Sequence, residues 1–227
     1  MTKHKDREYS WELFLSLQTM ATRTSGNAVF GGDEFAHIQA VEAQQAGELR
    51  KMKKFRFQLL HRWLTERFEP CRVADIAGGK GLLAYLLQQS GWNAVVIDPV
   101  HQSLIDKYKN ITTGTRVKIA GEESVPHIDK PFVKEMGEQF DLLVGLHAHG
   151  CNAAIIDAAA EYGCGFVLFP CCVIDEPFYP PIGVEWLESL ADYAIRKDLS
   201  ATPFRLNFKG QNIGVYEVGK CRLKRNN

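Results

Sequence analysis

The spacing of apolar residues divides the chain into two regions of different character. In the first region apolar positions recur every three or four residues, which predicts helices over 9–20, over about 34–53 and from Phe55 onward. The stretch TRTSGNAVFGGD at 22–33 contains three glycines and predicts a loop between the first two helices. Pro70 ends the third helix, and the pattern changes after it.

Beyond Pro70, short apolar runs alternate with stretches of helical spacing. The predicted strands are 72–77, 93–98, 115–120, 140–146 and 164–170, and the predicted helices are 81–91, 101–110, 152–163 and 184–197. Residues 204–218 predict a terminal hairpin that turns at Lys209–Asn212. Because parallel strands need crossover helices, this order predicts an α/β fold. Its sheet would be doubly wound, Rossmann-like and seven-stranded, and would end in an antiparallel hairpin.

Length and composition are those of an ordinary globular protein. The 227 residues are 45% hydrophobic and 24% charged, enough for one well-buried domain over 70–227 with an N-terminal helical extension over 1–69. No apolar run reaches the roughly 20 residues that span a bilayer, and the N-terminus lacks the apolar core of a signal peptide. The six cysteines do not suggest a disulfide scaffold. We therefore expect a cytoplasmic protein with no membrane partner.

Charge is balanced overall and uneven locally. The formal net charge is zero, so no global field indicates a nucleic-acid partner. The segment RKMKKFR at 50–56 is strongly basic, and so is KCRLKRNN at 220–227. Such segments can be a solvated helix face and a frayed terminus, or a surface that faces phosphate groups. Charge alone leaves the partner open.

The most informative turn is ADIAGGKG at 74–81, between the first predicted strand of the sheet and its helix. Its glycines at 78, 79 and 81 would let the backbone approach a ligand at the carboxyl edge of the sheet, where doubly wound folds bind cofactors. Asp98 ends the second strand, 23 residues after Asp75. A carboxylate at that point can accept hydrogen bonds from both hydroxyls of a ribose.

Two kinds of cofactor fit such a turn. The pattern Gly79-x-Gly81-x-x-Ala84 satisfies the loose dinucleotide fingerprint of nicotinamide and flavin enzymes. Asp75 lies just before the glycines, and a pyrophosphate gains nothing from a carboxylate close by. The ammonium group of S-adenosylmethionine does gain from it. The turn therefore favours S-adenosylmethionine.

A second cluster of reactive residue types follows the fourth and fifth predicted strands. His147 and His149 come after the fourth strand, where an extended chain would place both imidazoles on one face, and Pro170, Cys171 and Cys172 end the fifth. The spacing His147-x-His149-x-Cys151 is unusual for structural zinc, and adjacent cysteines rarely face one ion, so we predict no metal site. A nucleophilic cysteine and plain apolar packing are the other interpretations.

These motifs together resemble a known family. D-x-A-G-G-K-G-x-L at 75–83, G-L-H-A-x-G at 145–150 and F-V-L-F-P-C-C at 166–172 are similar to motifs of class I S-adenosylmethionine-dependent methyltransferases. The resemblance is to the branch that includes tRNA acceptor-stem 2′-O-ribose methyltransferases and related methyltransferase-like proteins. MKKF at 52–55 also resembles a basic-aromatic helix of that branch.

The resemblance implies a function and a set of site residues. The cofactor pocket would be lined by Asp75, Ala77, Gly78, Gly79, Gly81, Asp98, Pro99, Gly145 and Leu146. The acceptor side would hold the candidate catalytic residues His147, His149 and Cys171, beside Pro170 and a wall formed by 175–183. The expected function is an S-adenosylmethionine-dependent methyltransferase, with RNA ribose or base as the favoured acceptor. The alternatives are a small-molecule methyltransferase and a non-catalytic subunit with the same fold. The sequence does not indicate an oligomeric state, and it lacks the extra cysteine and histidine zinc modules of the tRNA enzymes.

Overall fold

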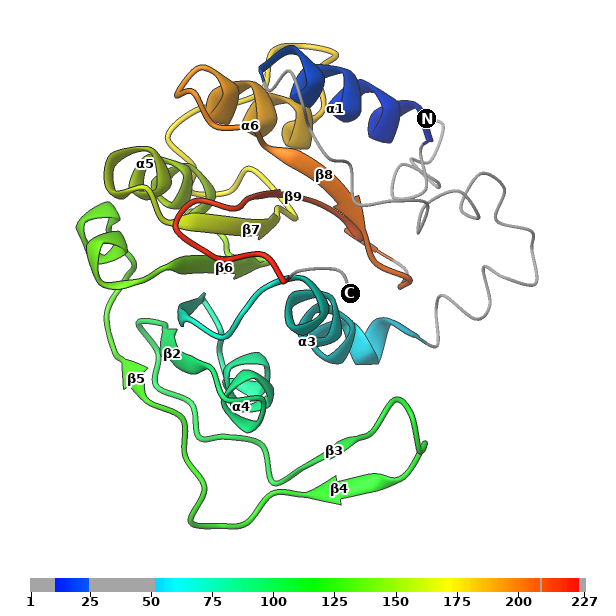
Figure 1. Ribbon diagram of the computed structural model, residues 1–227, viewed down its shortest axis with the longest axis vertical. Helices are drawn as coiled ribbons and strands as arrows, with labels where there is room; N and C mark the ends of the chain where they lie inside the picture. Colours follow the sequence, from blue (N-terminus) through cyan, green and yellow to red (C-terminus); the bar gives the residue numbers. More distant parts are fainter. Residues whose placement is uncertain (1–10, 25–51, 209, 225–227) are drawn as a thin grey trace.

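The computed structural model describes residues 11–24, 52–208 and 210–224 (Figure 1). Its helices are α1 (Trp11–Thr24), η3 (Lys53–Phe55), α3 (Arg56–Arg67), α4 (Leu82–Gln89), η4 (Lys134–Gln139), α5 (Asn152–Tyr162) and α6 (Trp186–Ile195), where η marks a 3-10 helix. Its strands are β1 (Arg72–Ile76), β2 (Asn93–Ile97), β3 (Lys107–Lys109), β4 (Arg116–Lys118), β5 (His127–Ile128), β6 (Leu142–Leu146), β7 (Gly165–Phe169), β8 (Thr202–Arg205) and β9 (Ile213–Glu217).

Seven of these strands form one sheet in the order β5-β2-β1-β6-β7-β9-β8. Strands β5, β2, β1, β6 and β7 pair in parallel, and β9 pairs antiparallel with both β7 and β8. The order runs outward in both directions from β1, so the sheet is doubly wound. This confirms the predicted fold class, including the seven strands and the antiparallel C-terminal hairpin. Lys209, in the predicted turn of that hairpin, lies outside the described residues.

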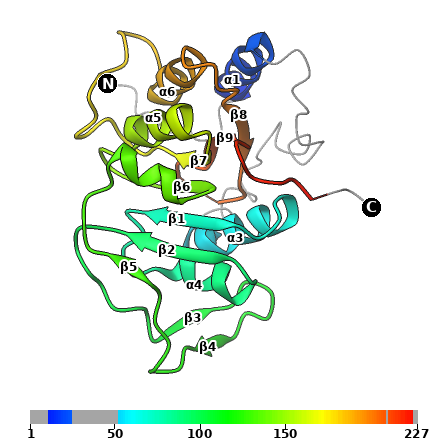
Figure 2. The same cartoon turned by 60° about the vertical axis from the view of Figure 1, so that its left-hand side comes forward.

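Helices cover both faces of the sheet. One face packs against α1, α5 and α6, with Phe14, Ile155 and Leu190 in its core, and the other packs against α3 and α4 (Figures 1 and 2). Consecutive strand residues serve opposite faces, so Leu143 of β6 belongs to the first core and Val144 to the second. With both faces covered, β6 is buried along its whole length.

Two predictions between residues 101 and 120 were wrong. No helix forms over 101–110, and 115–120 does not supply the third parallel strand; instead β3 and β4 pair as a separate two-stranded sheet (Figure 2). The side chain of Asn110 turns the chain back by accepting hydrogen bonds from two backbone N–H groups, those of Thr112 (2.8 Å) and Thr113 (3.0 Å). The third parallel strand is β5, which has only two residues and therefore leaves no apolar run in the sequence.

The N-terminal helix α1 packs on the domain itself. It contacts α6 and β8, and Phe14 and Leu17 are buried in the same core as β7 (Figure 1). The Ser16 hydroxyl donates a hydrogen bond of 2.5 Å to Glu188 of α6. The boundary between an extension at 1–69 and a domain at 70–227 stays a prediction. The predicted loop and second helix fall largely on 25–51, outside the described residues.

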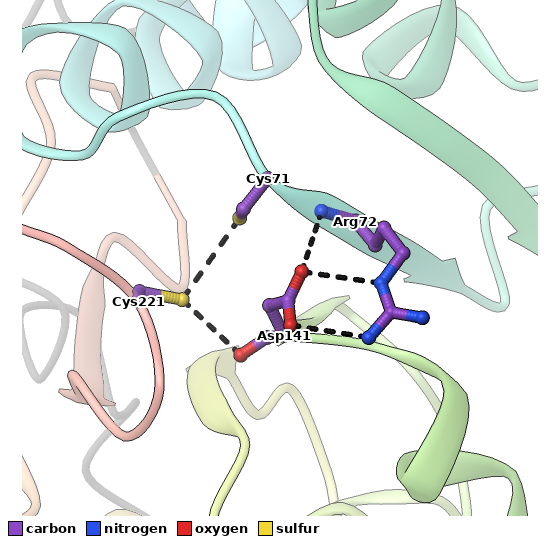
Figure 3. A network of polar contacts seen from close by, with 4 residues as sticks. All are labelled: Cys71, Arg72, Asp141 and Cys221. Atoms are coloured by element: carbon purple, nitrogen blue, oxygen red, sulfur yellow. Dashed lines mark hydrogen bonds and ion pairs between the residues drawn. The ribbon is translucent and has the colours of Figure 1, made fainter.

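The last described residues are fixed at the amino edge of the sheet, the edge opposite the glycine turn. Figure 3 shows the thiol of Cys221 donating to the backbone carbonyl of Asp141 (3.1 Å) and lying 3.9 Å from the sulfur of Cys71. The Asp141 carboxylate accepts hydrogen bonds from the backbone N–H of Arg72 (3.0 Å) and from its guanidinium (3.4 Å). All six cysteines are free thiols. Among the described residues, no helix is both long and apolar enough to cross a bilayer.

Candidate functional site

The glycine turn after β1 lies at the carboxyl edge of the sheet and is held by backbone hydrogen bonds. The N–H of Ala77 donates to Ile97 at the end of β2 (2.8 Å), and the N–H of Gly81 donates to Gly78 (3.0 Å). A Cβ at Gly78 would lie 2.6 Å from Oδ2 of Asp75, so only glycine lets the turn pass this close to the carboxylate. Gly81 has a φ of +70° at the start of α4, a conformation that also favours glycine.

Asp75 is a buried acid with an unsatisfied oxygen. Its side chain is 2% exposed, and its Oδ2 has no hydrogen-bond partner. Burial raises the pKa of this carboxyl to about 7, the nearby charge of Asp98 adds to the increase, and a hydrogen bond from the backbone of Ala84 opposes it. Leaving a buried polar atom unpaired costs about 1–3 kcal/mol. Such an atom beside a glycine turn fits a site that is completed by a cationic ligand.

Asp98 follows β2 and ties the neighbouring loop to the glycine turn. Its carboxylate accepts hydrogen bonds from the backbone N–H groups of Gly79 (3.1 Å) and Val100 (2.9 Å). A carboxylate can accept about four hydrogen bonds, so two positions stay open for hydroxyl groups. Pro99, the next residue, is exposed. The two acids that the sequence placed in the cofactor pocket therefore lie at adjacent strand ends.

A cavity of about 320 Å³ opens beside the turn. Residues that line it include Lys80, Gly81, His101, Gln102 and His127. The carboxylate of Asp129, which follows β5, contacts the imidazoles of both His101 (3.0 Å) and His127. The cavity thus begins at the glycine turn and extends toward the ends of β2 and β5.

The end of β6 forms the other side of the turn. Gly145 and Leu146 are buried, and a Cβ at Gly145 would lie 2.9 Å from Leu168 on β7. His147 has a φ of +64° and its N–H donates to the carbonyl of Phe169 (3.1 Å), so the chain bends here. The chain is therefore not extended at His147, as the expectation of a shared face for His147 and His149 had assumed.

His147 lies near several basic side chains. Burial lowers the pKa of its imidazole to about 4, and the charges of Arg56, Lys53 and His149 lower it further. Arg56 is half-buried at the start of α3, and its Nε has no hydrogen-bond partner. The basic segment before the first strand therefore reaches the end of β6. Arg50 and Lys51 of that segment lie outside the described residues.

His149 reaches across to the end of the neighbouring strand. Its Nδ1 lies 2.9 Å from Sγ of Cys172, and its Nε2 lies 3.6 Å from Sγ of Cys171. The two sulfur atoms are 3.8 Å apart. Burial and the adjacent Cys172 raise the pKa of the Cys171 thiol to about 11. The structure thus brings together His149, Cys171 and Cys172, while Cys151, which the sequence spacing had grouped with the histidines, lies outside this set.

One residue of this region escaped the sequence analysis. Glu176 is buried in the loop after β7, and its carboxylate accepts hydrogen bonds from the backbone N–H groups of Asn152 (3.0 Å) and Ala153 (3.1 Å) at the start of α5. It also binds the side chain of Asn152 (2.6 Å). The sequence feature that could have indicated this role is an acidic residue among the prolines and aromatics of DEPFYPPIG at 175–183. In the structure Glu176 joins this loop to α5.

The strand order identifies the fold to which this site belongs. A doubly wound sheet whose last strand, β9, is inserted antiparallel between β7 and β8 is the arrangement that the resemblance predicted. The chain has the fold of a class I methyltransferase. In this methyltransferase fold the glycine turn after β1 and the ends of β2 and β6 meet at one edge of the sheet.

Comparisons with known proteins include a sequence relative. A protein of Caenorhabditis elegans named "Probable tRNA (uracil-O(2)-)-methyltransferase" is 32% identical over 108 residues, which are 46% of this chain and 18% of that protein. This part of the chain is therefore similar in sequence to a protein named as a tRNA methyltransferase. The chain spans only about a fifth of that relative's length. No protein-family model matches the chain.

Solved structures give distant similarities. CalO1, a methyltransferase of calicheamicin biosynthesis in its SAH-bound form, is 13% identical with a TM-score of 0.38, over 90% of this chain and 68% of that one. Monomeric WbdD is 16% identical with a TM-score of 0.32, over 84% and 45%. The fold assignment rests on the strand order.

Proposed function

We propose that the chain is an S-adenosylmethionine-dependent methyltransferase and that RNA is its methyl acceptor. The observation that carries the proposal is the buried carboxylate of Asp75, whose Oδ2 is unpaired beside Gly78 at the carboxyl edge of β1. A ligand that brings positive charge to this turn would satisfy that oxygen and offset the cost of burying the acid. A pyrophosphate at the same place would be repelled.

The cofactor set follows from the same edge of the sheet. Asp75 would face the ammonium group, and Asp98, with acceptor positions left over after binding Gly79 and Val100, would hold the ribose hydroxyls. Ala77, Gly78, Gly79 and Gly81 would supply the close backbone approach, and Pro99, Gly145 and Leu146 the remaining walls. When bound, S-adenosylmethionine would supply a methyl group already activated by its sulfonium.

The acceptor side would be the edge formed by the ends of β6 and β7. His147 would orient the acceptor group and receive its proton as the new bond to the methyl group forms and the bond from sulfur to that methyl group breaks. His149 and Cys171 would line the same side. The loop 173–183, which Glu176 fastens to α5, would shield the site from water.

Two observations support RNA as the acceptor. The curated relative is named as a tRNA methyltransferase. Lys53 and Arg56 lie close enough to His147 to lower its pKa, so cationic side chains reach the proposed reaction site and could bind phosphate groups. A net charge of zero means that this local group, rather than a global field, would attract the RNA.

Transfer of a labelled methyl group tests the proposal. The protein is incubated with methyl-labelled S-adenosylmethionine and either total RNA or a metabolite extract. We expect label in RNA from the wild type, and a loss of at least about tenfold in His147→Ala. Cys71→Ser, at the opposite edge of the sheet, is the control and should keep full activity. Label only in small molecules would contradict the RNA acceptor, and cofactor binding without transfer to either would identify a non-catalytic subunit.

A further inference from the structure

We propose that His149, Cys171 and Cys172 form a zinc site whose fourth coordination position is open to solvent. Their ligand atoms lie within 4.8 Å of one another. The three residues come from two adjacent strand ends, since His149 follows β6 and both cysteines follow β7. This inference does not depend on methyl transfer, and it departs from the sequence-based expectation of no metal.

Two distances between possible ligand atoms fit a tetrahedral ion. Two sulfurs about 2.3 Å from zinc at a tetrahedral angle lie about 3.8 Å apart, and a sulfur and an imidazole nitrogen lie about 3.6 Å apart. The sulfurs of Cys171 and Cys172 are 3.8 Å apart, and Nε2 of His149 lies 3.6 Å from Sγ of Cys171. The distance of 2.9 Å from Nδ1 of His149 to Sγ of Cys172 is a hydrogen bond of the metal-free cluster. Metal binding would replace that bond.

The donor set selects the metal by its chemistry. Two thiolates and one imidazole are soft and borderline ligands, which favour zinc over magnesium or calcium. Each thiol would lose its proton as its sulfur binds, so the uptake of one Zn²⁺ by two thiols and a neutral imidazole releases two protons to the solvent. The net charge of the cluster is then zero. No oxidant or reductant is needed.

Exposure of the cluster argues for an open site rather than a closed structural one. His149 is exposed, and both cysteines are half-buried, so solvent reaches the cluster. Three protein ligands with a water in the fourth position are typical of catalytic zinc. Residues at or beyond 171 follow no regular strand, which is why adjacent cysteines can turn their sulfurs to the same side. On the proposed function, this open position would lie on the acceptor side.

A second polar cluster of the described residues lacks these features. His101 and His127 both contact one carboxylate oxygen of Asp129, so these three groups satisfy one another without a cation. They also offer a single anionic ligand, against two thiolates in the first cluster. The thiolate cluster is therefore the better metal site.

Metal binding by the purified full chain tests the proposal. The protein is reduced, stripped with a chelator, loaded with zinc, passed through a desalting column and analysed for metal. The wild type should hold about one zinc per chain, and His149→Ala, Cys171→Ser and Cys172→Ser should each lower that content several-fold. Cys151→Ser removes a thiol from the same loop but outside the cluster, and should keep the wild-type content. Loading with cobalt should give the thiolate-to-metal absorption of a tetrahedral site, and an exogenous ligand such as azide should change that spectrum.

A second measurement uses only the wild type, so it is independent of whether a variant folds. Zinc should protect Cys171 and Cys172 from N-ethylmaleimide, as read by mass spectrometry, and should leave the labelling of Cys71 and Cys151 unchanged. The proposal is overturned if the reduced wild type retains no zinc, if the three variants retain as much as the wild type, or if zinc gives no protection. Because none of these readouts uses the cofactor, their failure is distinguishable from a failure of the proposed function.

Discussion

The carboxylate of Asp98 accepts a hydrogen bond of 3.1 Å from the backbone N–H of Gly79. This bond joins the end of β2 to the glycine turn after β1, and Asp98 also adds to the electrostatic cost of ionising Asp75. The two acids therefore act on each other and on the same turn.

Replacing Asp98 by alanine should weaken cofactor binding and loosen the turn together. The substitution leaves the N–H groups of Gly79 and Val100 without their acceptor and removes the proposed ribose contact. We expect the affinity for S-adenosylmethionine to fall by about tenfold or more, because each such hydrogen bond contributes about 1 kcal/mol. Calorimetry measures the affinity. Asp98→Asn retains an acceptor oxygen and should lose less, and an equal loss in both variants would contradict this role.

The two glycines of the turn should differ in their tolerance of alanine. At Gly78 a Cβ would lie 2.6 Å from Oδ2 of Asp75 and 2.9 Å from its backbone oxygen, whereas at Gly79 the nearest atom is the flexible Gln102 side chain at 3.6 Å. Gly78→Ala should therefore abolish cofactor binding. In Gly79→Ala the main cost is the φ of +56°, which is unfavourable for alanine by about 1 kcal/mol. This variant should bind the cofactor more weakly than the wild type but measurably. Thermal unfolding of each variant checks that it folds, and equal binding by Gly78→Ala and the wild type would refute the close approach.

The affinity for S-adenosylmethionine should depend on pH through Asp75. The groups that act on this carboxyl are the Asp98 carboxylate and the backbone of Ala84, and with burial they place its pKa at about 7 in the free protein. Below that pH the acid is protonated and offers no charge to the ammonium, so the affinity should fall by up to about tenfold per pH unit. Calorimetry between about pH 5.5 and 7.5 measures this slope. In Asp75→Asn the slope should be absent, and a wild type with no slope would contradict the ionised contact.

The contribution of Asp75 to the stability of the ligand-free protein should fall as the pH rises from about 4 to 7. The folded-state pKa of Asp75 is raised from 3.8 to about 7, so in this interval the folded state binds more protons than the unfolded state. The contribution of Asp75 to the free energy of unfolding therefore decreases by about 1.4 kcal/mol per pH unit. Other groups also titrate here, so the difference between the wild type and Asp75→Asn in urea unfolding isolates the effect. If the difference in unfolding free energy between the two proteins stays constant with pH, the pKa of Asp75 is not raised in the folded state.

Glu176 should matter for stability more than its place in a loop suggests. Glu176→Gln keeps the size of the side chain but loses the charge that binds the two N–H groups at the start of α5. We expect a loss of about 1–3 kcal/mol in the free energy of unfolding, with the largest increase in hydrogen exchange in 173–183 and the first turn of α5. Glu185→Gln makes the same substitution at the start of α6 and serves as the comparison variant for both measurements. No change in either measurement would contradict the anchoring role.

Strong periodic patterns made the sheet predictable. The runs that became β6 and β7 are apolar and buried over all five residues, because a parallel strand is covered on both faces, and β1 and β2 are mainly apolar after an exposed first residue. The glycine turn was also visible, since Asp75 and Asp98 stand at strand ends that the topology brings to one edge. Local residue types sufficed for these features.

Features that depend on tertiary contacts could not be predicted. The two-residue strand β5 exists because it pairs with β2, and Lys107–Lys109 extends because it pairs with Arg116–Lys118. The chain bends at His147, which has a positive φ, and His149 beyond the bend contacts Cys171 and Cys172. Adjacent cysteines argue against a shared ion only while the chain around them is taken as extended.

Calorimetric titration of S-adenosylmethionine into the wild type and Asp75→Asn at about pH 7.5 tests the central claim most directly. Asparagine keeps the shape of the side chain and removes its charge, so both proteins should fold. The wild type should bind with a micromolar Kd, and the variant about ten- to a hundredfold more weakly. Equal affinities, or no binding by the wild type at millimolar cofactor, would contradict a cationic ligand held by the acid beside the glycine turn.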